Sequence, residues 1–565
     1  MKDQGEKATV SPTQSRCDWH SIDWASAIAF VRKLRQEIFR ATKEGDLGKV
    51  RTLQRIMLRS YENRVMAVRQ VTQTNRGKNT PGVDKVVLKT PEARGKLVDR
   101  LAHYEMWKPL PARRVYIPKA NGSQRPLGIP AITDRAVQAM VKNALEPFWE
   151  ARFEDSSYGF RPGRSCHDAL SRAYMHARAS GTRRWVLDAD IKGAFDNIGH
   201  DKLMEVIGNF PARELIRQWL KAGYLDDGVY HDTDSGTPQG GVISPLLANI
   251  AFHGMEESLG VRYHNWDQSL HKKSVGLVRY ADDFLVFCHT HEEAEEAKRK
   301  LAVWFRERGL CFSEEKTRIV HLEEGFDFLS FNVRLYKVLK SKTGYRLLMR
   351  PAKKAVIKYA RELKKTFRES RGNTADLLCV AVNRKMRGWV QYFRHGVASR
   401  VFHKLDAYLF KLQWRWARWE HSKRGKQWRR KRYWGRVKAD RADNWTFHGQ
   451  KSHMRKHSWT PIKRHVMVRR LASVDDPDLE GYWADRKAQE AINSLTDFQR
   501  AVAERQKWVC PVCRDWIMNG EEWHEHRVIP GRDGGRYTRD NVRLVHLFCH
   551  QVEHRGKRKM AKDES

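Results

Sequence analysis

Two adjacent carboxylates, Asp282 and Asp283, stand between two apolar segments near the middle of the chain. Residues 275–280 and 284–287 are rich in β-prone side chains, which predicts a hairpin of buried strands with both carboxylates at its tip. Carboxylates in such a place repel each other and lose hydration, so they need a compensating charge. Two divalent cations would supply it and can drive an in-line displacement at phosphorus. The alternative is an acidic turn in solvent.

A third carboxylate, Asp190, ends another segment with strand character. Residues 184–190 predict a short strand, and the aromatic residue Phe195 lies in the turn beyond it. This combination resembles the palm of reverse transcriptases. In that resemblance Asp190 matches the first catalytic aspartate, and Asp282 and Asp283 match the second catalytic block.

The resemblance implies a site for two Mg²⁺ ions formed by these three aspartates, with Ile191 as a further metal-binding position. One ion would activate the primer 3′-hydroxyl, and the other would bind the triphosphate and the leaving pyrophosphate. Phe195 matches the aromatic residue that screens the 2′ position of the incoming deoxynucleoside triphosphate (dNTP). The alternative for Phe195 is a core side chain, and one face of its ring could pack while the other gates.

A triphosphate also needs cations, and residues 110–130 predict a hairpin that carries two of them. Its strands join at Asn121-Gly122, and Lys119 and Arg125 lie on opposite strands near the tip. Two cations on a stiff ribbon suit a triphosphate, since arginine offers bidentate contacts. The segment resembles the fingers hairpin of the same family. Surface cations without a ligand are the alternative.

Two further segments complete the resemblance around the nucleotide. Residues 236–245 form a Gly-rich loop before a helix predicted over 246–255, a place where backbone can approach an anionic ligand closely. In the family this block underlies the templating pair and the incoming nucleotide, with Gln239 at the contact position. Lys316 matches the palm lysine near the leaving phosphates, which implies an electrostatic or acid role.

Composition restricts the partners of the chain. Its 565 residues include 107 Lys+Arg against 67 Asp+Glu, for a formal net charge of +40. A charge of this size favours a long polyanion, because each neutralised phosphate releases counterions. No apolar segment reaches the ~18 residues of a membrane span, and the first residues lack the apolar region of a signal peptide. We therefore expect no membrane partner and a cytoplasmic protein. The family resemblance implies that it is bacterial or organellar and nucleoid-associated.

Helical periodicity flanks the predicted polymerase. It covers residues 24–72, with Gly45 and Gly48 between two helices, and returns as three helices over 353–370, 376–395 and 399–420. Residues 387–393 and 414–419 resemble the maturase, or thumb, domain of group II intron-encoded proteins. Residues 411–440 hold five tryptophans and twelve Lys/Arg, which can stack on bases and bind phosphates. For each tryptophan, core packing and RNA contact both stay open. The resemblance implies RNA contacts at Arg387, Trp389, Tyr392, Arg415 and Arg418.

The C-terminal region combines two cysteines in a C-x-x-C spacing with a later H-x-x-C pair. Cys510, Cys513, His546 and Cys549 suit a tetrahedral, structural Zn²⁺ site. The other five cysteines are scattered, which indicates ordinary thiols in a reducing compartment.

The remaining polar residues of this region, His526, Asn541 and His550, resemble the His-Asn-His (HNH) nuclease motif. The resemblance implies that a strand histidine activates water, Asn541 holds the hairpin, and His550 helps to bind one divalent ion. Counting back from Pro530, however, Arg527 stands where the base histidine belongs. We favour His526 as the base, paired with Glu525; if Arg527 takes the position instead, cleavage is weak or absent. A zinc knuckle that only binds DNA is the alternative.

We therefore predict a multidomain α+β fold: right-hand polymerase fingers and palm with an antiparallel sheet plus helices, a helical thumb or maturase domain, and a small zinc-containing ββα HNH domain. The resemblance is to a group II intron-encoded protein that copies RNA into DNA, assists splicing and nicks target DNA during retrohoming. The implied partners are intron RNA, target DNA and dNTP. There are two alternatives: a splicing maturase with weak or lost nuclease activity, and another template-dependent polymerase.

The expected regions are a disordered tail 1–16, an N-terminal extension 17–85, fingers and palm 86–345, maturase or thumb 346–436, a DNA-binding region 437–495 and the nuclease 496–556.

Overall fold

The computed structural model describes residues 17–554, except for 119–121, 123, 265–268, 438–440, 493–494 and 520. The predicted tail 1–16 and the nucleotide-binding candidate Lys119 therefore lie outside the described residues.

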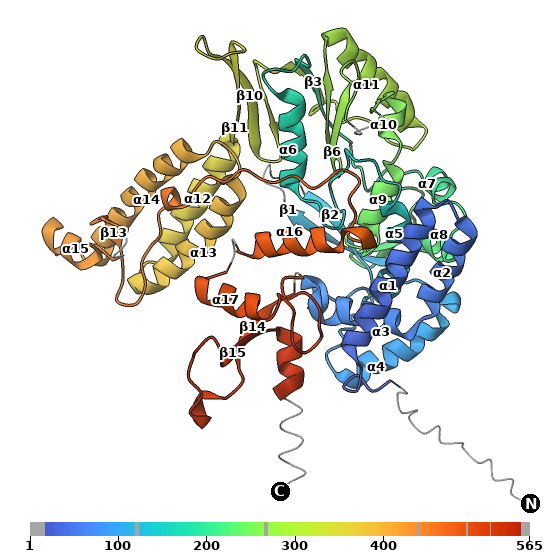
Figure 1. Ribbon diagram of the computed structural model, residues 1–565, viewed down its shortest axis with the longest axis horizontal. Helices are drawn as coiled ribbons and strands as arrows, with labels where there is room; N and C mark the ends of the chain where they lie inside the picture. The colour runs from blue at the N-terminus through green and yellow to red at the C-terminus, as the bar shows by residue number, and fades with distance from the viewer. Residues whose placement is uncertain are drawn as a thin grey trace, which may run out of the picture.

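A helical unit begins the described chain, as its periodicity predicts, and is blue in Figure 1. Its first helix starts after Asp23, whose carboxylate accepts hydrogen bonds from the backbone N–H groups of Ala25 and Ser26. Gly45, with φ +79°, makes the turn to the next helix. The elements are α1 (Trp24–Lys43), α2 (Leu47–Arg59), α3 (Tyr61–Arg69), the π-helical turn η1 (Gln70–Thr74), η2 (Arg76–Asn79), α4 (Pro91–Arg100) and η3 (Leu101–Met106).

Strands and helices alternate through the next 240 or so residues, the span expected for fingers and palm. The helices are α5 (Ile132–Glu150), α6 (Cys166–Ala177), α7 (His200–Ile207), α8 (Arg213–Lys221), α9 (Ser244–Ala251), α10 (Met255–Ser258) and α11 (His291–Arg306). The strands are β1 (Ala112–Pro118), β2 (Gln124–Ile129), β3 (Trp185–Asp190), β4 (Tyr224–Asp226), β5 (Val229–His231), β6 (Gly276–Tyr280), β7 (Asp283–Cys288), β8 (Arg318–His321), β9 (Phe326–Phe328), β10 (Phe331–Lys337) and β11 (Tyr345–Pro351).

The central sheet has the strand order β6-β7-β3-β8 and is antiparallel throughout. Side chains alternate between its two faces, and each face joins a different hydrophobic core. Leu187 and Val286 belong to the core shared with α1–α5 and α11, whereas Val186 and Leu285 belong to the core shared with the thumb helices. The palm sheet is thus buried on both sides, which holds its strand ends in place.

The predicted hairpins are confirmed. β6 and β7 pair with Tyr280 opposite Asp283, and β1 and β2 pair with Ile117 opposite Arg125. The helix predicted over 246–255 is shorter: α9 ends at Ala251, and Gly254, with φ +100°, separates it from α10.

The three predicted thumb helices are also confirmed and form the yellow and orange lobe in Figure 1. Trp416 and Trp434 are buried in its core, while Trp419 and Trp428 are exposed. Core packing therefore accounts for Trp416 and Trp434, and RNA contact stays a prediction for Trp419 and Trp428. The elements are α12 (Lys353–Glu369), α13 (Ala375–Phe393), α14 (Ser399–Glu420), α15 (Lys426–Tyr433), β12 (Trp434–Gly435) and β13 (Thr446–Phe447).

The region after the thumb, where a DNA-binding role is predicted, contains a strap of residues 461–483 that runs back across the palm to the N-terminal helices (Figure 1). Val468 N–H donates to the buried carboxylate of Asp168 at the start of α6 (2.7 Å). Arg35 of α1 binds both oxygens of Asp475 (2.7 and 2.8 Å) and also pairs with Glu146. The acidic sequence 475–478 therefore has a packing role, which the sequence did not explain.

Replacing Asp475 with alanine should lower the free energy of unfolding by about 3 kcal/mol, because it leaves the buried Arg35 guanidinium with one acidic partner instead of two. Asp478→Ala is the matched control, since Asp478 lies three residues away and is exposed. Thermal unfolding of the two variants beside the wild type measures the difference. Equal midpoints for both variants would show that the Arg35 contact does not hold the strap.

The last part of the chain is a compact module that docks on the N-terminal helices. Arg69 of α3 is buried, pairs with Glu521 (3.1 Å), and lies over the rings of Trp24 and Phe548 (4.9 and 5.2 Å). One hydrophobic core is continuous across this contact. The region between the thumb and this module contains η4 (His457–Trp459), η5 (Pro477–Leu479) and α16 (Glu480–Ile492). The module contains α17 (Asp497–Arg505), β14 (Trp523–Arg527), η6 (Gly531–Asp533), β15 (Val542–His546) and helical residues 547–554.

Candidate functional site

Asp190 and Asp283 lie directly opposite each other in the central sheet. β3 ends at Asp190 and β7 begins at Asp283, and the two are register partners in the antiparallel pair. Side chains at directly opposed positions project from the same face, with Cβ atoms about 4.5–5.5 Å apart. Carboxylates that are almost a hundred residues apart in the chain are therefore neighbours at one end of the sheet.

Asp282 joins them from the turn between β6 and β7. The turn is tight because Ala281 has φ +58°. The backbone N–H of Ile191 donates to the carbonyl of Asp282 (3.4 Å), and that of Ser313 donates to the carbonyl of Asp190 (2.8 Å). Backbone hydrogen bonds thus tie the ends of the strands that carry all three carboxylates.

The three carboxylates are electrostatically crowded. Burial, and then the charges of Asp282 and Asp190, raise the pKa of Asp283 to about 7. Burial and the charge of Asp190 also raise the pKa of Asp282, while Arg125 and Lys316 oppose that rise. Carboxylates that resist ionisation for these reasons are suited to hold divalent cations, whose charge removes the repulsion.

Cations already approach this group from two directions. Lys316 forms an ion pair with Asp190, and the positive charge of Arg125 in β2 opposes the rise in the pKa of Asp282. Among the described residues, the oxygens of the three aspartates do not all lie within 4.8 Å of one another. Mutual repulsion and the Lys316 pair account for that spread.

The predicted nucleotide-side residues Phe195 and Gln239 are connected through the turn after β3 and the Gly-rich loop. Gln239 Nε2 donates to Asp196 Oδ2 (3.3 Å), and Thr237 N–H donates to the Phe195 carbonyl (2.6 Å). Phe195 is half-buried and meets Phe160 edge-on at 6.0 Å, so its ring packs on one side, as the sequence allows. Gly240, with φ +136°, has no room for a Cβ, which would lie 2.6 Å from the Gly128 carbonyl of β2. The Gly-rich loop is thereby locked against the fingers hairpin.

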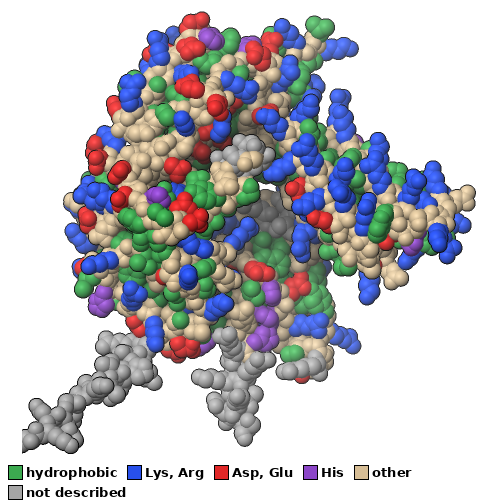
Figure 2. All heavy atoms as spheres, turned by 180° about the vertical axis from the view of Figure 1, so that it is seen from behind, with side chains coloured by type: hydrophobic (Ala, Val, Ile, Leu, Met, Phe, Trp, Pro, Cys, Tyr) green, Lys and Arg blue, Asp and Glu red, His purple; other side chains and the backbone are tan. Residues whose placement is uncertain are grey.

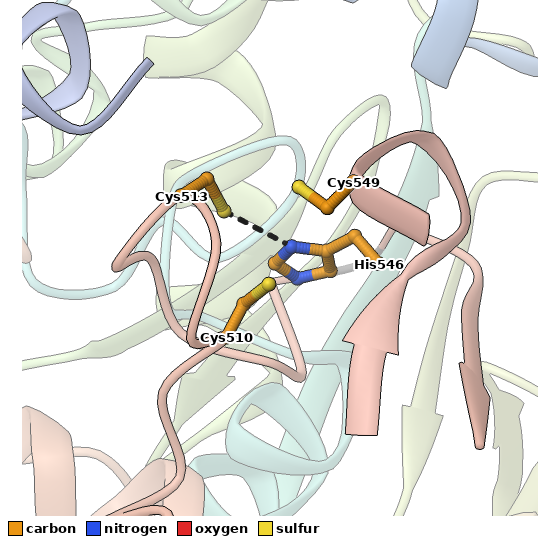
Figure 3. A group of neighbouring side chains, drawn as sticks. All are labelled: Cys510, Cys513, His546 and Cys549. Carbon is orange, nitrogen blue, oxygen red and sulfur yellow. Dashed lines mark hydrogen bonds between the residues drawn. The ribbon is translucent and has the colours of Figure 1, made fainter. Parts of the chain in front are cut away.

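The four predicted zinc ligands converge in the C-terminal module (Figure 3). Cys510, Cys513, His546 and Cys549 are all buried, and their ligand atoms lie within 4.8 Å of one another. His546 Nδ1 lies 3.3 Å from Cys513 Sγ, while its Nε2 lies 3.2 Å from the Trp516 carbonyl. A hydrogen bond from Nε2 leaves Nδ1 free as a metal ligand, so the residues fit a closed tetrahedral site.

A second group that could hold a metal consists of His526, His550 and His554, whose ligand atoms also lie within 4.8 Å of one another. His526 Nε2 is buried and has no hydrogen-bond partner among the described residues, as expected of a nitrogen that coordinates a metal ion. Glu553 Oε2 lies 3.8 Å away. His554 and Glu553 were missed by sequence analysis, although their spacing from His550 on a helix of residues 547–554 places all three near one another.

The geometry of β14 bears on the choice between His526 and Arg527. His526 faces the histidine group, while Glu525 points the other way and accepts a hydrogen bond from Gln499 (2.6 Å). The expected Glu525–His526 pair is therefore absent from the structure, because adjacent strand residues face opposite sides. Arg527 is exposed, with its guanidinium over the ring of Tyr537. Asn541 bridges the loop by accepting from Ile529 N–H (2.8 Å) and donating to the Ile529 and Arg536 carbonyls.

In the thumb, the predicted RNA-binding arginines are exposed, whereas the predicted RNA-binding aromatic residues have contacts within the protein. Arg387, Arg415 and Arg418 are exposed. Trp389 instead stacks on Tyr359 (4.6 Å between centroids, 13° between planes), and the Tyr392 hydroxyl donates to the Leu329 carbonyl (2.8 Å). The two aromatic residues thus have packing partners within the protein.

Comparisons with known families follow the same order along the chain. The N-terminal domain of reverse transcriptase matches residues 19–101, and reverse transcriptase (RNA-dependent DNA polymerase) matches residues 117–333. The group II intron, maturase-specific domain matches residues 356–434, and HNH endonuclease matches residues 510–556. This chain belongs to the family of group II intron-encoded proteins.

Individual relatives of this group II intron-encoded protein cover parts of its length. Protein YkfC of Escherichia coli (strain K12) is 36% identical over 310 residues, 49% of this chain and 80% of that protein. Group II intron-encoded protein LtrA of Lactococcus lactis subsp. cremoris is 33% identical over 322 residues, 46% of this chain and 53% of LtrA. Maturase-like protein 1 of Euglena gracilis is 24% identical, over 56% of this chain and 66% of that protein. The chain thus spans about half of LtrA.

The helices offer no membrane span. Within the described part of the chain, none combines the length and the apolar character that crossing a bilayer requires.

Proposed function

We propose that the protein is an RNA-directed DNA polymerase that also assists splicing of its intron RNA and nicks target DNA during retrohoming. The observation that carries the polymerase assignment is the register of Asp190 opposite Asp283, with Asp282 in the adjoining turn. The family membership supports the same assignment. We place the protein in the cytoplasm of a bacterium or in an organelle, associated with the nucleoid.

In this proposal Asp190, Asp282, Asp283 and the backbone of Ile191 hold two Mg²⁺ ions. When bound, these ions would lower the pKa of the primer 3′-hydroxyl and neutralise charge on the triphosphate. Lys316, which pairs with Asp190 in the structure, would stabilise charge on the leaving pyrophosphate. Arg125 and Lys119 would bind the triphosphate from the fingers hairpin. Phe195 and Gln239 would restrict the sugar and support the templating pair.

Primer extension tests this proposal. The purified protein, with an RNA template, an annealed DNA primer, dNTPs and Mg²⁺, should lengthen the primer, and the reaction should fail when any one component is omitted. A folded protein that binds the template-primer duplex but adds no nucleotide under these conditions would contradict the polymerase assignment.

The proposed RNA surface rests on cations that lack acidic partners. Lys and Arg gather on the thumb lobe, at the right in Figure 2. Beside α13, a cavity of about 1140 Å³ is lined by Arg387, Arg455, Lys463 and Arg464, and none of these four forms an ion pair among the described residues. Burial, and then the like charges of Arg387 and Arg441, lower the pKa of Arg455. Such a group suits phosphates.

Sequencing the RNA that co-purifies with the protein tests this part. The account predicts enrichment of one intron RNA, and retention that falls steeply as salt concentration rises. Random cellular RNA without enrichment would contradict a dedicated maturase.

The nuclease module is proposed to bind target DNA and one divalent ion. His526, His550 and His554 would hold the ion, Asn541 supports the hairpin, and the cysteine–histidine group would hold a structural Zn²⁺. The second candidate function, a splicing maturase with weak or lost nuclease, is favoured by one observation: His526 points into the three-histidine group and Arg527 is exposed on the far side. A histidine that serves as a metal ligand is not free to accept a proton from water.

Replacing His554 with alanine should weaken Mn²⁺ binding at the three-histidine group about 10-fold or more, because one of its three nitrogen ligands is lost. His524→Ala is the control, since His524 lies on the same strand as His526 but outside the group. Calorimetric titration with Mn²⁺ measures the affinity, and a nicking assay on duplex target DNA run beside it decides between an active and a lost nuclease. Equal Mn²⁺ affinities in the two variants would contradict the three-histidine metal site.

A further inference from the structure

The turn that carries the acidic pair has a backbone conformation that alanine does not favour. Ala281 connects β6 to β7 with φ +58°, in the left-handed region. For a residue with a Cβ this region is sterically disfavoured, so the surroundings must hold the turn in place. If the backbone at Ala281 relaxed, Asp282 and Asp283 would move with it.

Arg279 lies under this turn and is fully buried. Its Nη1 donates to the Ala281 carbonyl (3.3 Å) and to Asn249 Oδ1 (3.0 Å), and its Nη2 donates to Ser157 Oγ (2.7 Å). The guanidinium also lies over the ring of Phe252 at 5.4 Å. One planar side chain therefore joins the turn to α9 and to the loop before α6.

Asn249 completes the support from the other side. It is buried in α9, and its Nδ2 donates to the carbonyl of Gly159 (2.8 Å). Gly159 presses against the turn so closely that a Cβ there would lie 2.3 Å from the backbone nitrogen of Ala281. The turn is thus enclosed between the Gly159 backbone and the Arg279 guanidinium, and Asn249 links the two.

Burying the Arg279 guanidinium beneath the turn removes its charge from water, which is energetically unfavourable. Its Nε has no hydrogen-bond partner among the described residues, and no carboxylate is hydrogen-bonded to it. Burial lowers the pKa of Arg279 to about 10, against an opposing effect of Glu154. Apolar residues of similar volume often replace buried charges without loss of stability, so stability alone does not account for this arrangement.

The helix that carries Asn249 starts directly after the Gly-rich loop of residues 236–243. That loop lies against Gly128 of the fingers hairpin and joins Asp196 through Gln239. The contacts therefore run from the nucleotide side of the site, through α9 and Arg279, to the turn that bears the acidic pair.

We infer that Arg279 and Asn249 are positioning residues that hold the Ala281 turn, and so set the distance of Asp282 and Asp283 from Asp190 for divalent-cation binding. The inference rests on the proposed polymerase function, but it concerns metal affinity, which can be measured without catalysis. Neither residue touches the reacting atoms, so their loss should act through the carboxylates.

The test uses Asn249→Ala and Arg279→Lys in the full chain. Lysine keeps the charge and the stem but cannot reach Ala281, Asn249 and Ser157 together. Mn²⁺ affinity is measured by titration, and the component that disappears in Asp282→Ala is assigned to the polymerase site. We expect both variants to weaken this component about 10-fold, and to raise the Mg²⁺ concentration for half-maximal primer extension by a similar factor, with an unchanged KM for the template-primer duplex.

Asn63→Ala is the matched control. Asn63 is as buried as Asn249 and its Nδ2 likewise donates to backbone carbonyls, those of Met57 and Met140, but it lies in the N-terminal helices. It should lower the melting temperature without changing either metal measurement. Wild-type Mn²⁺ affinity in folded Asn249→Ala and Arg279→Lys would overturn the inference while leaving the polymerase proposal intact. If the variants weaken Mn²⁺ binding as predicted but the wild-type protein never extends a primer, the polymerase proposal is rejected and the positioning role is kept.

Discussion

Replacing Asp282 with alanine is expected to abolish DNA synthesis and to spare RNA binding and splicing. The carboxylate stands in the turn beside Asp283, which is the register partner of Asp190. Its loss would remove one of the three carboxylates proposed to hold the two cations. We expect primer extension to fall by at least about 10³-fold, equivalent to about 4 kcal/mol of transition-state stabilisation. Single-turnover extension and filter binding of the intron RNA measure the two effects on one protein preparation.

The control for this variant is Asp201→Ala, which removes an exposed carboxylate from the first turn of α7. It should retain wild-type extension. Loss of splicing with the polymerase intact in Asp282→Ala would contradict the separation of the two functions. The RNA surface proposed above is formed by Arg387, Arg455, Lys463 and Arg464, none of which belongs to the acidic turn, so the separation has a structural basis.

Loss of the proposed zinc site should have the second large effect. Cys513→Ser removes one of four buried ligands whose atoms lie within 4.8 Å of one another. Structural Zn²⁺ contributes roughly 10–16 kcal/mol to the folding of small zinc domains, so the module of residues 497–554 should unfold. Hydrogen exchange should show loss of amide protection in β14 and β15, and partial loss in α1 and α3, because Arg69 and Phe548 join the module to those helices.

Cys311→Ser is the control for that experiment, since it makes the same substitution at an exposed cysteine outside the cluster. Protection in the palm strands should remain in both variants. If Cys513→Ser unfolds the module but α1 and α3 keep full protection, the docking contact does not stabilise the N-terminal helices. If the module stays folded and zinc content is unchanged, the ligand assignment is wrong.

Local patterns predicted the elements of this site well. The two apolar, β-prone segments around Asp282 and Asp283 predicted the β6–β7 hairpin, and the C-x-x-C and H-x-x-C spacings predicted the buried cysteine–histidine group. Such signals lie within a few residues of chain, where backbone geometry dictates the outcome. The pairing of Asp190 with Asp283 was expected only through the family resemblance, because register across a long separation is set by tertiary packing.

Contacts between distant segments were not predictable from the sequence. No role for the acidic residues 475–478 followed from the sequence, yet Asp475 is buried against Arg35, because each becomes satisfied only in the presence of the other. Trp389 was expected to contact RNA, but it stacks on Tyr359. Whether its ring faces the protein or solvent depends on how the helices pack. His554 was missed because its partners come from two separate elements.

The most direct test of the account is the location of Mn²⁺ by anomalous scattering in crystals of the protein with an RNA template, a DNA primer and an incoming dNTP. Two peaks about 3.5–4 Å apart, both in contact with Asp190 and the Asp282–Asp283 pair, are the predicted result. Carboxylates that stay apart with no ion between Asp190 and Asp283, in a complex where template, primer and nucleotide are all seen, would contradict it.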